Sequence, residues 1–417
     1  MKDPIKLFNS MGRSKMDFRP GKGREVRIFT CGPSIYARPH IGNFRTFLFQ
    51  DVLVRYLDFK GYRVIRAMNL TDVEDKAIMM ADTEGLTLSE LTERNERRLW
   101  EEWDALGLKW PDKVPRSSRS VSRSVKLIKM LLKNGIAYKD GKDVFYDPTR
   151  FDGFGRLFGL DMLKWPKRPR KFRKDTYPGV QWNMGDFILW HGCGEEDRVC
   201  WDEDLGSGRP SWNVQDPAMC WESLGTGIDI WCGGWDNLWR HHDYNIAVME
   251  GAFGKELAPY WLHGGHLLLD GRKMSKSKGN ILYTEDLIEK GYSMKEVRFY
   301  LLYGNYRDQR NLTMKGLKET VERLRSAVRS LESIGKFDGG RTSCDAKDQI
   351  ERIVPDILER MDDDLDLKGA FDGLQGKLMR LSECSMSGEL SKIDAKMVLS
   401  IVAGIDRFWG FLTPGNQ

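Results

Sequence analysis

The stretch FTCGPSIYARPHIGN, residues 29–43, decides the fold of this 417-residue chain. It begins inside RIFTC, residues 27–31, an apolar and β-branched run that is typical of a buried strand and that ends at a Gly-Pro pair. Apolar residues then recur at helical spacing from 41 to 60, and Gly61 follows as a stop signal before a second apolar run at 63–68. A strand, a polar turn, a helix and another strand predict the α/β class, with a doubly wound parallel sheet that binds a nucleotide.

Two short polar segments indicate what that fold binds. HIGN, residues 40–43, stands at the mouth of the expected helix, where unpaired N–H groups and the helix dipole favour a phosphate. KMSKS, residues 273–277, places two lysines on a loop bounded by glycine, from which they can close over the same triphosphate. Either segment alone is weak evidence, but the pair in this order points to adenylation chemistry.

Length and composition limit the class of protein. A chain of 417 residues is too long for one ordinary core, so two or three domains are expected. No apolar run approaches the roughly 20 residues that a membrane helix needs. The first 20 residues mix charged side chains with few consecutive apolar ones, unlike a signal peptide. We therefore expect a cytoplasmic protein with no membrane partner.

Charge and cysteine content leave two questions open. The formal net charge of +5 permits RNA binding without arguing for it. Basic residues gather at 164–174 with Trp165 and Phe172 between them, which fits either a solvated loop or a contact for polyphosphate or RNA. The seven cysteines lack the spacing of a disulfide framework, so we expect thiols or metal ligands.

Later segments predict an insertion and then the second half of the sheet. The pattern of residues 86–132 is mainly helical and charged, and aromatic and turn-forming segments alternate at 135–159. Together these residues are typical of an insertion between the two halves of the sheet. Further strands are expected at 228–230 and 260–269, with a helix at 243–253 between them. The expected domains are a catalytic domain over residues 1–312, with an insertion at about 86–180, and a domain of amphipathic helices over 313–417.

The chain resembles the class I aminoacyl-tRNA synthetases and, among them, the cysteinyl-tRNA synthetases. The resemblance covers nearly the whole chain, and its motifs occur in the family's order. They are residues 29–43, NLTDVEDK at 69–76, DFILW at 186–190, GRPSW at 208–212, GGWDNLWRHH at 233–242, GRKMSKSKGN at 271–280 and, in the helical domain, MDDDLD at 361–366.

The resemblance implies an ATP-dependent ligase that forms an aminoacyl adenylate, with Mg²⁺ on the pyrophosphate. His40 and Asn43 would contact the ATP phosphates, while Lys273 and Lys276 would stabilise the charge developing on the α-phosphate. The adenosine-contacting segment of the family falls on Gly234 and Asp236. The ATP-binding residues implied by the resemblance are Gly42, Gly234, Asp236, Ser275 and Ser277.

The resemblance also implies a zinc ion that binds the substrate thiolate, held by two cysteines, a histidine and a glutamate. Here these positions carry Cys31, Asp216, His241 and Asn245, so one thiolate and one carboxylate are replaced. Because a neutral amide is a poor zinc ligand, the sequence predicts that zinc is not bound at these four positions. The alternative is a relocated zinc ion that uses Cys220 or Cys232. The amino-acid pocket implied by the resemblance contains Cys31, Trp212, Asp216, Trp231, His241 and Asn245, with Trp231 and Asn213 replacing histidines.

The amino acid and the acceptor stay open. Asp216 can pair with a cationic or hydroxyl group, so the leading hypothesis is an adenylating ligase whose amino acid differs from cysteine. Family members continue with a segment that grips the tRNA anticodon, whereas this chain stops at Gln417. That outline is shared by the ligase that joins cysteine to an amino sugar in mycothiol synthesis. Besides tRNA, a small amine or peptide is therefore a possible acceptor; genuine cysteine-tRNA ligation and a non-catalytic module that binds RNA or an amino acid are the remaining alternatives.

Overall fold

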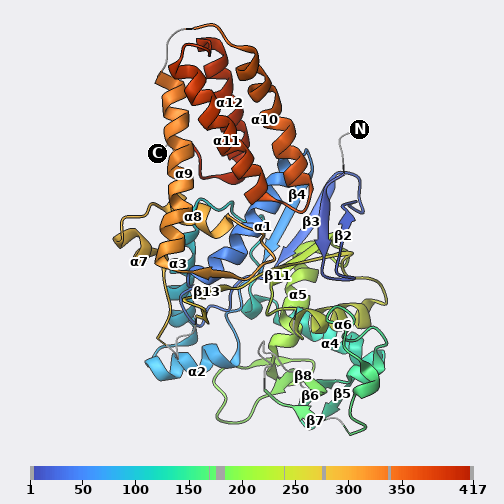
Figure 1. Ribbon diagram of the computed structural model, residues 1–417. Helices are drawn as coiled ribbons and strands as arrows, with labels where there is room; N and C mark the ends of the chain where they lie inside the picture. Colours follow the sequence, from blue (N-terminus) through green and yellow to red (C-terminus); the bar gives the residue numbers. More distant parts are fainter. Residues whose placement is uncertain are drawn as a thin grey trace.

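The central element of the fold is a parallel sheet of four strands in the order β12-β11-β3-β4 (Figure 1). Its strands are β3 (Glu25–Thr30), β4 (Arg63–Met68), β11 (Ile230–Gly234) and β12 (Tyr260–Gly264). The strand order reverses between β3 and β11, which is where open α/β sheets bind their ligands. The computed structural model describes residues 4–168, 170–174, 184–238, 240–274, 279–336 and 340–413.

The two faces of this sheet contribute to separate hydrophobic cores. Ile28 and Ile230 face the core that contains α1 (Ile41–Phe59). Their neighbours Phe29 and Trp231 face the opposite core, because successive side chains of a strand alternate. That second core is built with α4 (Val121–Lys133), α5 (Trp212–Leu224) and α6 (His241–Phe253). Coverage of both faces confirms the predicted doubly wound parallel sheet.

Three predicted bounds in the second half of the sheet are wrong. The strand predicted at 228–230 is β11, which continues through a glycine pair because backbone ladder bonds to β12 need no side chain. The strand predicted at 260–269 divides into β12 and β13 (Leu267–Leu269). It breaks at Gly265, where a Cβ atom would lie 2.3 Å from the carbonyl oxygen of Asp308. The helix expected at 243 begins two residues earlier.

A second sheet, mainly antiparallel, is formed by the part of the chain between β4 and β11. Its path is β5-β6-β8-β10-β9, and β7 pairs in parallel with β8. This sheet continues to residue 210, whereas the insertion was expected to end near 180. The bounds of the catalytic and helical domains remain predictions. The strands are β5 (Ala137–Asp140), β6 (Asp143–Tyr146), β7 (Arg170–Phe172), β8 (Gly185–Gly192), β9 (Trp201–Glu203) and β10 (Gly206–Pro210).

Two features of this second sheet bear on the sequence expectations. Cys193 and Cys200 form a disulfide across a short loop, so the expectation of thiols or ligands was wrong for these two. The loop is closed locally, since Gly194 N–H donates to Asp197 at 2.7 Å.

The basic segment at 164–174 makes ion pairs within the second sheet. Lys171 and Arg173 of this segment both pair with the acidic Asp140.

Smaller elements surround the sheets. A three-stranded sheet in the order β14-β13-β15 follows the parallel sheet in sequence, and a hairpin of β1 and β2 precedes it. The strands are β1 (Lys6–Asn9), β2 (Ser14–Asp17), β14 (Arg272–Lys273) and β15 (Arg310–Leu312). The helices are α2 (Asp75–Glu84), α3 (Leu88–Ala105), α7 (Thr284–Glu289) and α8 (Met294–Leu302), with short 3₁₀ turns η1 (Ser117–Arg119), η2 (Pro148–Arg150) and η3 (Met162–Lys164).

A helical bundle forms the C-terminal end of the molecule, at the top of Figure 1. It contacts α1, where the Tyr56 hydroxyl donates to Asp362 at 2.7 Å and the Tyr56 ring packs on Phe408. In the described part of the chain, no helix combines the length and the apolar character needed to cross a membrane. The bundle helices are α9 (Met314–Lys336), α10 (Cys344–Asp362), α11 (Leu367–Met386) and α12 (Lys392–Trp409).

A buried ion pair fixes the bundle and α8 to α1. The Asp51 carboxylate on α1 accepts from Arg298 Nη2 on α8 at 2.5 Å, and both side chains are buried. Arg298 also donates to the backbone oxygens of Trp409 and Leu106. Burial alone would raise the pKa of Asp51, but the charges of Arg298 and Arg55 outweigh it and lower that pKa below its usual range.

Asp51→Ala tests the contribution of the buried Asp51–Arg298 ion pair to stability. The change leaves a buried guanidinium without its charge partner, so we expect the free energy of unfolding to fall by about 3–5 kcal/mol, measured by urea denaturation. The matched control is Glu319→Ala, which breaks an exposed pair with Lys315 and should cost less than about 1 kcal/mol. Equal losses in the two variants would contradict the role given to the pair.

Candidate active site

A cavity opens where the carboxyl ends of β3 and β11 meet. Most of the predicted site residues line it, whereas Trp231 and Asn245 are fully buried behind the lining. Ser275, Lys276 and Ser277 lie outside the described residues. The predicted residues that line the cavity are Cys31, His40, Gly42, Asn43, Trp212, Asp216, Gly234, Asp236, His241 and Lys273.

The first wall of the cavity is the N-terminus of α1. His40 is the N-cap residue, and its Nδ1 accepts from Gly42 N–H at 3.1 Å. Asn43 returns the contact, because its Oδ1 accepts from His40 N–H at 2.9 Å. A neutral ring that accepts at Nδ1 carries its proton on Nε2. The helix end therefore offers an oriented N–H donor together with the positive end of its dipole, a combination that suits a phosphate.

The second wall holds the segments that come after β11 and β13. Asp236 comes two residues after the end of β11, and its carboxylate lies 3.6 Å from the ammonium of Lys273. Both side chains are substantially exposed, so this pair is weak and a ligand can replace either partner. Gly234 N–H is held by the side-chain oxygen of Asn237 at 2.9 Å. The structure thus places residues from around 40, 236 and 273 about one hollow.

The floor of the cavity is centred on the buried carboxylate of Asp216. Asn69 Nδ2 donates to its Oδ1 at 2.9 Å, and His241 Nε2 lies 2.9 Å from its Oδ2. The thiol of Cys31 donates weakly to the same Oδ2 at 3.5 Å. The indole of Trp212 stacks on His241, with ring centroids 4.1 Å apart. Residues from three other segments therefore converge on one acidic group of α5.

A chain of buried side chains continues behind the floor. Cys31 Sγ lies 3.0 Å from His242 Nε2, and His242 Nδ1 contacts His263 Nε2 at 2.8 Å. His263 in turn contacts the Ser10 hydroxyl at 2.8 Å. The indole N–H of Trp231 is shared by two acceptors, His242 Nε2 at 3.2 Å and Cys31 Sγ at 3.4 Å.

Burial keeps this chain uncharged. It raises the pKa of the Cys31 thiol, with the negative charge of Asp216 as the next cause. It also lowers the pKa of His242 well below its usual value and that of His263 to about 3. The thiol and both imidazoles are therefore neutral near pH 7.

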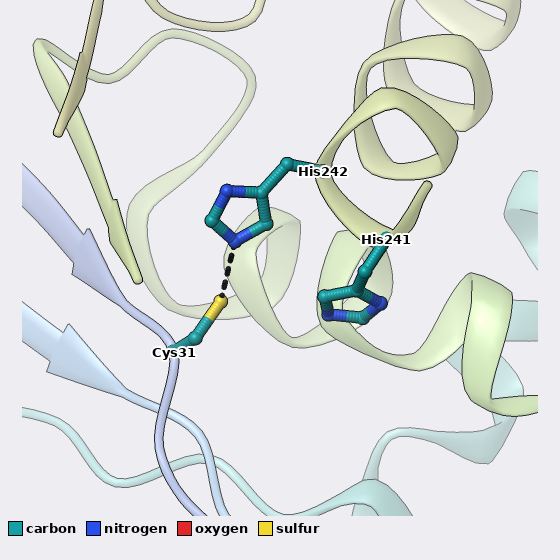
Figure 2. A group of neighbouring side chains, drawn as sticks. All are labelled: Cys31, His241 and His242. Atoms are coloured by element: carbon teal, nitrogen blue, oxygen red, sulfur yellow. Dashed lines mark hydrogen bonds between the residues drawn. The ribbon is translucent and has the colours of Figure 1, made fainter. Parts of the chain in front are cut away.

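Three of these side chains also form a cluster that can hold a metal ion. The ligand atoms of Cys31, His241 and His242 all lie within 4.8 Å of one another. Figure 2 shows His242 pointing at Cys31 from the start of α6, with His241 beside it. The sequence reasoning missed His242; the signal was the histidine doublet, of which the resemblance selected only the first member.

The backbone is strained at Arg240, the residue that immediately precedes the two histidines. Arg240 has a φ of 72°, a region that residues other than glycine rarely adopt, at a cost of about 1–3 kcal/mol. This conformation begins α6 at His241, so that both histidines lie on its first turn. One turn further along, neither side-chain atom of the buried Asn245 has a hydrogen-bond partner among the described residues. His241 Nδ1 has no partner in that part of the chain either.

Comparisons with known proteins agree with this architecture. A family model described as the catalytic domain of class I (C) tRNA synthetases matches residues 17–322. The cysteine-tRNA ligase of Protochlamydia amoebophila is 32% identical, over 98% of this chain and 86% of that protein. That of Chlamydia pneumoniae is 35% identical, over 97% and 86%. The methionyl-tRNA synthetase of Mycobacterium tuberculosis, bound by methionyl-adenylate, shares the fold with a TM-score of 0.63 and 15% identity, covering 93% of this chain and 88% of that one.

Gly234→Ala tests whether the second wall contacts a nucleotide. A Cβ atom there would lie 2.8 Å from Asp236 Oδ1, so the Asp236 carboxylate must leave its place beside Gly234. We expect ATP affinity to fall about tenfold or more by calorimetry, a loss of about 1.4 kcal/mol. Gly376→Ala in α11, where a Cβ atom meets nothing within 4 Å, should leave ATP affinity unchanged. Unaltered ATP binding by Gly234→Ala would remove this wall from the nucleotide site.

Proposed function

We propose, because this chain belongs to the class I tRNA synthetases of the cysteine type, that its cavity joins an amino acid to AMP and passes the aminoacyl group to a tRNA. One observation carries the proposal: the capped N-terminus of α1 and Lys273 face one cavity, although more than half the chain separates them. Relatives named cysteine-tRNA ligase match nearly the whole chain, including its helical bundle, which supports tRNA as the acceptor.

The first step is attack of the amino-acid carboxylate on the α-phosphorus of ATP, with pyrophosphate as the leaving group. The protein supplies no nucleophile; it positions the reactants and stabilises charge. His40 and Asn43 hold the phosphates at the positive end of α1, and Lys273 and Lys276 stabilise the pentavalent α-phosphate. Mg²⁺, when bound, neutralises the charge of the departing pyrophosphate.

The adenosine occupies the second wall. Asp236 lies beside Gly234 at the end of β11, where a carboxylate can accept from the ribose hydroxyls and a glycine lets the base approach the backbone. Its exposed pair with Lys273 exchanges for these contacts at little cost. Binding of ATP would thereby release Lys273 towards the phosphates.

The second step transfers the aminoacyl group from the adenylate to the acceptor, and AMP leaves. A hydroxyl of the terminal ribose of tRNA attacks the carbonyl carbon, and no further protein nucleophile is needed. The cavity opens between the parallel sheet and the first residues of α5, which come after the second sheet in the chain. The acceptor end would enter beside these elements.

Exchange of labelled pyrophosphate into ATP, measured with each of a full panel of amino acids, tests the first step. Lys273→Ala and Asn43→Ala should each lower the exchange rate about 100-fold or more, because each removes a group that stabilises the transition state. Lys315→Ala, an exposed change at the start of α9, is the control and should keep the full rate. If no amino acid supports exchange in the parent protein, adenylation is excluded.

Transfer to RNA needs its own measurement. Incubation with total tRNA, ATP and the amino acid that supports exchange should give labelled material that acid precipitates and that ribonuclease releases. Label that instead appears on a small amine or a peptide, with none on tRNA, would show that adenylation is correct and that the proposed acceptor is wrong.

A further inference from the structure

The floor of the cavity holds a buried carboxylate that no lysine or arginine of the described residues pairs with. Asp216 is 1% exposed, and its basic neighbour is the imidazole of His241. Asn69 donates a neutral hydrogen bond to the other oxygen. A buried carboxylate is costly unless donors or a cation satisfy it, and it retains lone pairs for further donors. This carboxylate also lines the cavity, so a ligand can reach it.

The side chains around Asp216 do not fit the zinc ion of the cysteine-type synthetases. At the four corresponding positions, His241 Nε2 already contacts Asp216, and Asn245 offers only a neutral amide. Among the residues that the structure describes, His241 Nδ1 has no hydrogen-bond partner, and the carboxylate of Asp216 stands where a metal would otherwise meet Nε2.

His242 does not restore the zinc site. Its Nε2 accepts the indole N–H of Trp231 at 3.2 Å, so the lone pair that a metal would use is occupied. Its Nδ1 is engaged by His263. The same N–H of Trp231 lies 3.4 Å from Cys31 Sγ, the thiol of the cluster that Cys31 forms with His241 and His242. A tryptophan at this position therefore satisfies the two atoms that a metal would have to bridge.

Space on the floor is limited as well. Trp212 covers one face of His241. Trp231 is completely buried and stacks on Trp261, with ring centroids 5.4 Å apart, so it fills the volume behind Cys31. A side chain that reaches Asp216 from the cavity must therefore be short.

We propose that this floor works without a metal and selects a short amino acid whose side chain ends in an O–H or N–H donor, which Asp216 accepts. The inference rests on the proposed adenylation and specifies its substrate class. A hydroxyl or ammonium group completes the hydrogen bonding of the carboxylate, whereas the thiol of cysteine is a weak donor and a methyl group is none. A polar site left unpaired by the wrong substrate rejects it strongly.

Pyrophosphate exchange with serine, 2,3-diaminopropionate, cysteine and alanine as probes tests the substrate class. We expect serine or 2,3-diaminopropionate to exceed cysteine at least tenfold and alanine about 100-fold or more, with rates unchanged after dialysis against a chelator followed by return of Mg²⁺ alone. Elemental analysis should find no stoichiometric zinc. A preference for cysteine, or one tightly held zinc per chain, would overturn the inference and leave adenylation intact. Absence of exchange with every amino acid would instead contradict the proposed function.

Asp216→Asn separates recognition from structure. The amide keeps the shape but places donors where the substrate needs an acceptor, so we expect KM for the preferred amino acid to rise about tenfold or more, with a smaller change in kcat. Asp406→Asn, the same change at a buried carboxylate of α12 away from the cavity, is the matched control and should leave KM unchanged. Equal effects on KM in the two variants would mean that Asp216 has only a structural role.

A reverse substitution gives an independent readout. In Asp216→Cys combined with Asn245→Glu and Trp231→His, a thiolate and a carboxylate return and the indole donor is removed. We expect this triple variant to bind about one zinc per chain by elemental analysis, where the parent binds none. Zinc in the parent at the same level would refute the metal-free floor.

Discussion

The parallel pairing of β3 with β11 is the constraint on which the rest of the structure depends. Ile28, Phe29 and Thr30 pair in register with Ile230, Trp231 and Cys232, and the N–H of Cys31 extends the ladder to Cys232 O at 2.9 Å. Because the strand order reverses at this pair, the helices that come after the two strands leave towards opposite faces. The N-termini of α1 and α6 therefore flank one hollow, with the groups proposed to bind phosphate on one side and the floor of the cavity on the other.

That separation lets the two halves of the site change independently. The groups proposed to bind ATP are a helix cap and exposed charges, whose positions depend on the start of α1, the turn after β11 and strand β14. The groups on the floor are buried and interlocked, because Asn69 and His241 both contact the carboxylate of Asp216. Under the proposals above, the nucleotide side keeps its charged and capping groups, while the floor recognises the amino acid by hydrogen bonds.

Local patterns in the sequence were enough to predict the first half of the parallel sheet. Periodicity located β3, α1 and β4, because a buried strand and a helix that packs on one face carry strong signals. It failed where distant partners decide the outcome. Continuation of β11 through two glycines depends on β12, the disulfide on the closure of a loop, and the role of His242 on Trp231 and His263, which lie on other strands. The positive φ of Arg240 has no sequence signal of its own.

Transfer of an oxygen atom tests the central claim of amino-acid adenylation most directly. The protein is incubated with ATP, total tRNA and the activated amino acid carrying ¹⁸O in its carboxylate, and the products are analysed by mass spectrometry. Attack of the carboxylate on the α-phosphorus, followed by acyl transfer, must leave one ¹⁸O in AMP and none in pyrophosphate. Formation of ADP and phosphate, or of AMP without label, would contradict the account.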